Sequence, residues 1–127
     1  MPNRMTIQAG AVTLKAELND SPTALQIWEA LPVTGRANTW GDEIYFGISV
    51  HAEEAEDARA DVAVGELGYW PVGKAFCIFF GPTPVSTGDA PRAASPVNIV
   101  GSILGDATQF RQVRAGTKVT LERDDSA

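Results

Sequence analysis

Residues 75–80 constrain the fold more than any other part of the chain, because the run is apolar on both faces. Successive side chains of a strand point to opposite faces. A strand here would carry two apolar sets, namely Ala75, Cys77 and Phe79 on one face and Phe76, Ile78 and Phe80 on the other. Such a strand is shielded from water on both sides. We therefore expect a central barrel strand, with one face filling the barrel and the other covered by a helix, a loop or a ligand.

The N-terminal segment shows the alternation that is typical of half-buried strands. Apolar and polar side chains alternate along residues 5–9 and again along residues 12–18. Gly10 lies between the two runs and favours a tight turn. The pattern predicts an antiparallel hairpin over residues 4–18.

One helix follows the hairpin. Ser21 suits its cap, because a serine hydroxyl accepts a free backbone N–H, and Pro22 suits the first helical position, where no N–H is needed. Large apolar side chains then recur at a spacing of i, i+3 and i+6, namely Leu25, Trp28 and Leu31, and Ala24 and Ile27 widen this stripe. We expect a helix over about residues 22–31 that packs this stripe against a sheet.

The rest of the chain supplies further short strands, which we expect over residues 33–40, 43–50, 97–104 and 118–122. Three segments lack a strand pattern: the acidic residues 51–61, the turn-rich residues 62–74 and the Gly- and Pro-rich residues 81–96. A loop as long as the last of these is usually functional or mobile. Many short strands, Gly/Pro turns and a single helix favour a closed or nearly closed barrel over residues 1–127.

Composition excludes several classes of function. The 127 residues include 10 Lys and Arg against 16 Asp and Glu, for a net charge of −6. This balance argues against nucleic acid as a partner, because binding to phosphates needs clustered basic side chains. The single cysteine, Cys77, and the single histidine, His51, exclude an internal disulfide and the common zinc motifs. We expect no metal and no cofactor.

Location is predicted from what the sequence lacks. No apolar run approaches the roughly 18 residues of a membrane span. The first ten residues contain Arg4 but no following apolar stretch of a secretory signal. We therefore expect a cytoplasmic protein with no membrane partner. Cys77 lies in the middle of the apolar run, so we expect its thiol to be buried and unreactive.

Several stretches resemble a small prokaryotic family of largely uncharacterised proteins with a cyclophilin-like barrel. The main one is ELGYWPVGKAFCIFFGPTP at residues 66–84, and further ones are NDSPTA at 19–24, TWGDEIY at 39–45 and SPVNIVG at 95–101. The resemblance implies a mainly β fold, an eight-stranded closed barrel with one capping helix. True cyclophilin isomerases have a Gln-Gly-Gly stretch and an arginine at the proline groove, and this chain contains no Gln-Gly-Gly.

Aromatic side chains are the best candidates for a ligand-binding groove, because large rings supply apolar area and Tyr and Trp add a polar group. The candidates are Trp40, Tyr45, Tyr69, Trp70 and Phe80. Glu43, Glu66 and Arg36 are candidate polar groups at its edge, and Arg36 and Glu66 are the candidates for catalysis. For each of them the competing interpretation is a core aromatic or an ordinary surface charge.

The leading hypothesis is a non-catalytic module that binds a peptide or a small apolar ligand in an aromatic groove. One alternative is a weak, divergent peptidyl-prolyl isomerase, which would need an arginine beside a proline slot. The other is a structural or interaction protein that forms homo-oligomers through the loop over residues 81–96 or through a strand edge, which would require a flat apolar patch.

Overall fold

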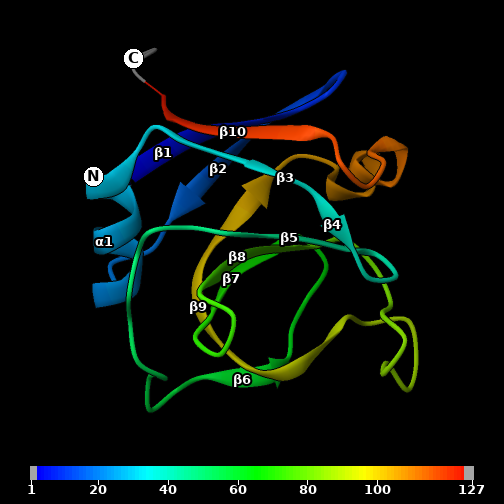
Figure 1. Cartoon of the computed structure of the whole chain (residues 1–127). Coiled ribbons are helices and arrows are strands. Elements are labelled where there is room, and N and C mark those ends of the chain that lie inside the picture. The colour runs from blue at the N-terminus through cyan, green and yellow to red at the C-terminus, as the bar shows by residue number, and fades with distance from the viewer. Residues whose placement is uncertain (1–2, 125–127) are drawn as a thin grey trace.

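A computed structural model describes residues 3–124 and is built mainly of strands (Figure 1). In chain order the elements are β1 (Asn3–Ala9), β2 (Val12–Leu18), α1 (Pro22–Ala30), β3 (Val33–Arg36), β4 (Asn38–Thr39), β5 (Glu43–Gly47), β6 (Arg59–Asp61), β7 (Glu66–Trp70), β8 (Ala75–Phe79), β9 (Arg92–Leu104), the 3₁₀ helix η1 (Ala107–Gln112) and β10 (Lys118–Arg123). Within this part of the chain, no helix combines the length and hydropathy that crossing a bilayer requires.

The strands run in the order β3-β10-β1-β2-β9-β7-β8-β5-β4, and β6 pairs with β9 outside this path. The two ends of the order, β3 and β4, are consecutive on the chain and are separated only by Ala37. The segment therefore pairs with β10 through its first half and with β5 through its second half. When β3 and β4 are counted as one bent strand, the barrel of the described residues has eight strands, as expected.

The N-terminal hairpin is confirmed. β1 and β2 pair antiparallel from Asn3 opposite Leu18 to Ala9 opposite Val12. Gly10 occupies the turn with a φ of +60°, a value that glycine adopts without strain. The side chains of Met5, Ile7 and Ala9 are buried, so the alternation in the sequence marks the face toward the core.

The helix begins where the capping signal predicts. The Ser21 hydroxyl accepts a hydrogen bond from the Ala24 backbone N–H, at 3.2 Å, and Pro22 is the first helical residue. The expected stripe is right in part: Ala24, Ile27 and Leu31 are buried, whereas Leu25 is 47% exposed and Trp28 is half-buried. The buried face is therefore centred on Ala24 and Ile27, the residues expected only to widen the stripe, with Leu31 at its end.

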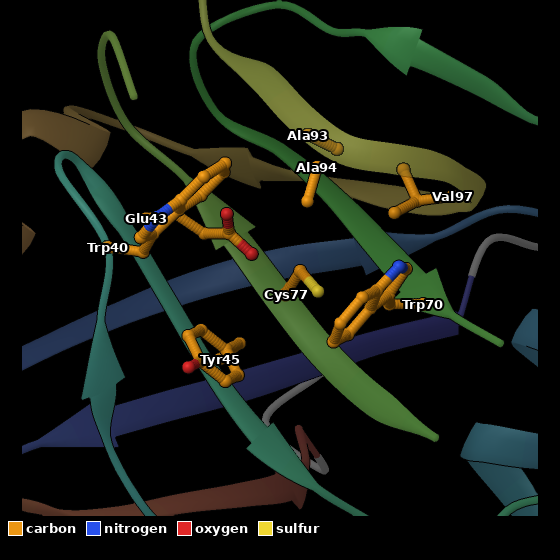
Figure 2. A pocket seen from close by; sticks show the side chains of 8 residues that line it. All are labelled: Trp40, Glu43, Tyr45, Trp70, Cys77, Ala93, Ala94 and Val97. Atoms are coloured by element: carbon orange, nitrogen blue, oxygen red, sulfur yellow. The ribbon is translucent and has the colours of Figure 1, made fainter. Parts of the chain in front are cut away.

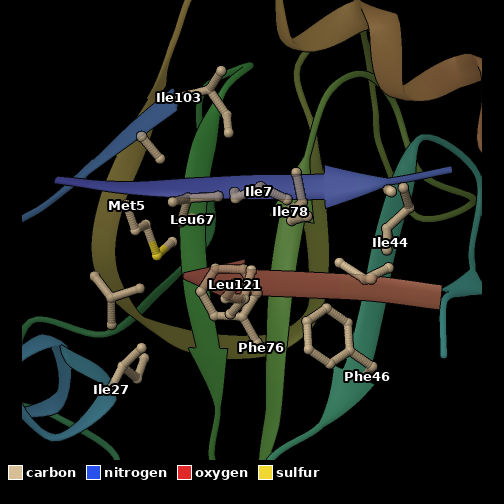
Figure 3. Close-up of a cluster of buried hydrophobic side chains, with 14 of the residues drawn as sticks. Met5, Ile7, Ile27, Ile44, Phe46, Leu67, Phe76, Ile78, Ile103 and Leu121 are labelled. Carbon is tan, nitrogen blue, oxygen red and sulfur yellow. The ribbon is translucent and has the colours of Figure 1, made fainter. Parts of the chain in front are cut away.

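Strand β8 has two buried faces, as its composition requires. Phe76 and Ile78 belong to the main core inside the barrel (Figure 3). The following Phe80 belongs to the same core. Cys77 and Phe79 belong to a second, smaller cluster, together with Val62, Ala93 and Val97. The covering layer on this second face is the first half of β9, which leaves the barrel to pair with β6.

Four expectations about local structure are wrong. Residues 59–61, in the acidic segment expected to lack a strand, form strand β6, which pairs with β9. Residues 66–70 form strand β7 rather than turns, because β7 pairs with both β8 and β9. Strand β9 begins at Arg92, inside the segment expected to be a loop, so the connection after β8 is shorter. The expected strand over residues 33–40 bends at Ala37, where backbone hydrogen bonds to Thr117 and from Gly116 divide β3 from β4.

Candidate functional site

A cavity of about 240 Å³ lies on the second face of β8, outside the main core (Figure 2). The sheet contributes Glu43 and Tyr45 from β5, Cys77 from β8 and Trp70 from β7, and Trp40 comes from the turn before β5. The opposite wall is the first half of β9, with Ala93, Ala94 and Val97. Aromatic rings and small aliphatic side chains thus make up most of the lining of this half-open cavity.

Strand parity explains which side chains reach the cavity. In the antiparallel register, Tyr45 lies opposite Cys77, and Cys77 lies opposite Gly68. These positions share one face of the sheet, whereas their neighbours Ile44, Phe46, Phe76 and Ile78 point into the barrel. Gly68 leaves room for β9 to cross, because a Cβ there would lie 2.9 Å from the Val97 side chain.

Glu43 is the one acidic side chain of the cavity lining within the described residues. It is only 6% exposed, and its carboxyl group points into the cavity next to Cys77 (Figure 2). Burial raises the pKa of the Glu43 carboxyl to about 7, although a hydrogen bond with the Cys77 thiol lowers it somewhat. Near neutral pH, Glu43 therefore changes between a hydrogen-bond donor and an anion.

Cys77 lies between the two tryptophans in the view of Figure 2 and is 1% exposed. Burial, and then the charge of Glu43, raise the pKa of the Cys77 thiol well above its ordinary value. A thiol that stays protonated is a poor nucleophile. Cys77 therefore lines the cavity as a weakly polar thiol rather than as an activated nucleophile.

Trp70 is held in place from two sides. Its indole Nε1–H donates a hydrogen bond to the Ser95 hydroxyl, at 2.6 Å, and so ties β7 to β9. The ring also packs on the turn after β7, since a Cβ at Gly73 would lie 2.6 Å from the ring. The ring position is thus fixed before any ligand binds, which lowers the entropy cost of binding.

Trp40 sits on a tight turn. Its backbone N–H donates to the Glu43 carbonyl at 3.0 Å, and Gly41 between them has a φ of +60°. The loop after β8 packs on this turn, because the Asp42 N–H donates to the Pro82 carbonyl at 2.9 Å. The Asp42 side chain forms an ion pair with Arg111 at 3.0 Å and does not line the cavity.

Two of the five aromatic residues predicted to bind a ligand lie outside the cavity. Tyr69 is fully buried in the main core, and its hydroxyl donates to the Val50 carbonyl at 2.7 Å. Phe80 is also in the main core, with its ring centroid 6.1 Å from that of Phe110. The structure brings Trp40, Tyr45 and Trp70 together and places Tyr69 and Phe80 on the other side of the sheet.

The predicted polar candidates also separate. Glu43 lines the cavity, whereas Glu66 is bound by the Arg59 guanidinium through two hydrogen bonds of 2.8 Å. This hydrogen-bonded pairing lowers the pKa of the Glu66 carboxyl. Arg36 is exposed on β3 and donates to the Gly116 carbonyl at 3.3 Å, away from the cavity lining.

A sequence profile described as cyclophilin-like matches residues 3–122. The chain belongs to the cyclophilin-like family. The solution structure of the hypothetical protein AF2241 from Archaeoglobus fulgidus is similar to it, with 38% sequence identity, a TM-score of 0.81, and coverage of 97% of this chain and 95% of that chain. No curated protein matches the chain.

The sequence indicated part of this candidate site. Ala93, Ala94 and Val97 were missed because they lay in a segment expected to be a loop or at its edge. The available signal was that Ala93 and Val97 are apolar residues spaced to share one face of a strand. In the described part of the chain, no group of three or more His, Cys, Asp and Glu side chains is placed to hold a metal ion.

Proposed function

We propose that this cyclophilin-like protein is a binding module whose cavity holds a small, mainly apolar group, either a free ligand or a peptide side chain. The observation that carries the proposal is the lining: three half-buried aromatic rings and three aliphatic side chains around one buried carboxyl group. Such a lining, with few polar groups, is typical of ligand sites. Its volume of about 240 Å³ favours a group smaller than a drug-sized molecule.

The lining favours binding over prolyl isomerisation. An isomerase must bind the twisted amide of its transition state more tightly than the planar ground state. The expected means is an arginine beside the proline slot, and no arginine of the described chain lines this cavity. Aromatic walls hold a proline ring without favouring the twisted amide, so the proposal places no catalytic residue here.

A blocking variant tests the proposal. Ala94 is exposed at the cavity wall, so Ala94→Phe would fill the space with little strain on the fold. Ala11, in the exposed turn after β1, provides the matched control Ala11→Phe. The measurement is a panel of small aliphatic, aromatic, neutral and cationic fragments, with binding detected by shifts of the Trp40 and Trp70 indole N–H signals in NMR spectra.

We expect at least one fragment class to shift both indole signals in the wild type and in Ala11→Phe, and to leave Ala94→Phe unchanged. A panel that shifts neither signal in the wild type would refute the proposed function. So would shifts that persist in Ala94→Phe, because the ligand would then lie outside the cavity.

A further inference from the structure

We propose that the group held in this cavity is a small alkylammonium cation, with the rings of Trp40, Tyr45 and Trp70 around it and Glu43 as its counter-ion. This inference rests on the proposed function, since it assigns the chemical class of the ligand to the same cavity. It is carried by the kind of side chain that surrounds the space, by the missing partner of Glu43 and by the charge of the molecule.

The aromatic rings of the cavity suit a cation. A cation over the face of Trp, Tyr or Phe is attracted by the ring quadrupole, and Trp is the strongest partner. Two tryptophans and a tyrosine line this one small space. In Figure 2 the rings of Trp40 and Trp70 lie on opposite sides of the cavity, with Tyr45 on a third. A neutral aliphatic ligand needs no such concentration of rings.

Glu43 is a buried carboxyl group in the lining of the cavity. A buried carboxyl group in a protein is usually paired with a cation or accepts several hydrogen bonds. The Cys77 thiol is a hydrogen-bond partner of Glu43. No Lys, Arg or His among the described residues lines the cavity. The other acids of this region have their own cations, Asp42 with Arg111 and Glu66 with Arg59. Glu43 therefore lacks the positive charge that its neighbours have, and a bound cation would supply it.

Among the described residues, the lining of the cavity around Glu43 contains no second charged side chain. Strand β8 contributes the Cys77 thiol, β7 contributes the Trp70 ring, and the first half of β9 contributes Ala93, Ala94 and Val97. The net charge of −6 further favours the approach of a cation over that of an anion. An anionic ligand would meet the Glu43 charge with no basic side chain in the lining to offset it.

Proton linkage follows from this arrangement. The pKa of Glu43 is about 7, and a cation beside the carboxyl group favours its ionised form. Cation binding must then release a proton when the pH lies below 7, and affinity must rise with pH. Because the ionised fraction of such a group grows from about a tenth to about nine tenths between pH 6 and pH 8, the affinity should grow by about tenfold.

The decisive experiment compares choline with 3,3-dimethylbutan-1-ol, which has the same shape and no charge. Both are titrated into the protein at constant ionic strength, with the Trp40 and Trp70 indole signals as the readout. We expect choline to bind about tenfold more tightly or better. Glu43→Gln keeps the size of the side chain and removes its charge, so it should weaken choline by a similar factor and leave the alcohol unchanged.

The outcomes separate the two proposals. If the alcohol binds as tightly as choline, or if Glu43→Gln leaves choline unaffected, the cation assignment is wrong and the apolar binding module stands. If neither compound nor any fragment of the panel moves the indole signals, the proposed function fails as well. A choline affinity that stays constant between pH 6 and pH 8 in the wild type would also overturn the role of Glu43 as counter-ion.

A trimethylammonium group reaches a protein either as a free small molecule or on a methylated lysine side chain. A third titration therefore uses a short peptide with trimethyllysine, with the unmodified lysine peptide as its control. Tighter binding of choline assigns the site to a free ligand, and tighter binding of the modified peptide assigns it to a modified protein. Equal binding of the modified and unmodified peptides, with no binding of choline, would contradict the proposal.

Discussion

At the scale of single residues, Glu43 should make stability depend on pH. Its pKa is raised from 4.5 to about 7 in the folded state, so the folded protein binds more protons than the unfolded chain between these values. The contribution of Glu43 to the free energy of unfolding is then greatest below about pH 4.5 and is lost as the pH rises through 7. The expected loss is on the order of 3 kcal/mol in the free energy of unfolding.

Glu43→Gln isolates this effect, because the amide does not titrate. Urea unfolding of both proteins at pH values from 5 to 8.5 measures it. The free energy of unfolding of the wild type should fall relative to that of the variant over this range. A difference between the two proteins that stays constant with pH would show that the Glu43 carboxyl group is not buried in solution.

Cys77 should react with thiol reagents only when the protein unfolds. Its side chain is 1% exposed, and burial keeps the pKa of the thiol high, so little thiolate is present at neutral pH. The measurement is labelling by a chromogenic disulfide reagent with and without denaturant. We expect slow labelling of the folded protein and prompt labelling in denaturant. Fast labelling of the folded protein would contradict the burial of this strand face.

At the scale of elements, helix α1 should depend on Ile27 rather than on Leu25. The Ile27 side chain is 0% exposed and the Leu25 side chain is 47% exposed. Ile27→Ala should therefore lower the free energy of unfolding by about 2–5 kcal/mol. Leu25→Ala, the matched control on the same helix, should change it by about 0.5 kcal/mol or less. Equal losses in the two variants, measured by urea unfolding, would favour the stripe predicted from the sequence.

The same helix shows which part of an element the sequence predicts. The start of α1 depends on local chemistry, the Ser21 hydroxyl and the ring of Pro22, and it was predicted correctly. The buried face depends on how the helix lies on the barrel, which no local pattern encodes. Trp28 is half-buried because the Arg123 guanidinium, 4.5 Å from the centre of its ring, covers it from strand β10.

Strand parity decided how much of the site the sequence could predict. Tyr69 and Trp70 are neighbours on β7, so one points into the barrel and the other into the cavity. The glycines and the proline around them suggested turns. Without a predicted strand, there was no alternation of side chains from which to place the two rings on opposite faces. Tyr45 and Glu43 share a face of the predicted strand over residues 43–50, so their meeting in one site was within reach of the sequence.

At the scale of the whole molecule, one short segment joins the two ends of the sheet. Residues 33–36 pair with β10 and residues 38–39 pair with β5, so the barrel depends on a close approach between strands that are not hydrogen-bonded to each other. Gly35 on β3 lies directly against Phe46 on β5 at this point. No sequence pattern indicates this role for Gly35, because the contact with Phe46 arises only when the two ends of the sheet meet.

Gly35→Ala should therefore destabilise the protein although Gly35 has no positive φ that would strain an alanine backbone. A Cβ at position 35 would lie 2.5 Å from a ring carbon of Phe46. The Phe46 ring cannot move aside freely, because it is fully buried and its centroid is 5.7 Å from that of Phe76. Overpacking of this kind costs about 1–3 kcal/mol in the free energy of unfolding.

The matched control is Gly47→Ala on β5, where a new Cβ would meet nothing within 4 Å. It should change the free energy of unfolding little, because the site is exposed and unobstructed. Phe46→Leu provides the second test, since a smaller side chain leaves room for the methyl group. The double variant Gly35→Ala/Phe46→Leu should then lose less stability than the sum of the two single variants. Strictly additive losses in urea unfolding would mean that β3 and β5 do not meet at Gly35, and that the barrel is open along this seam.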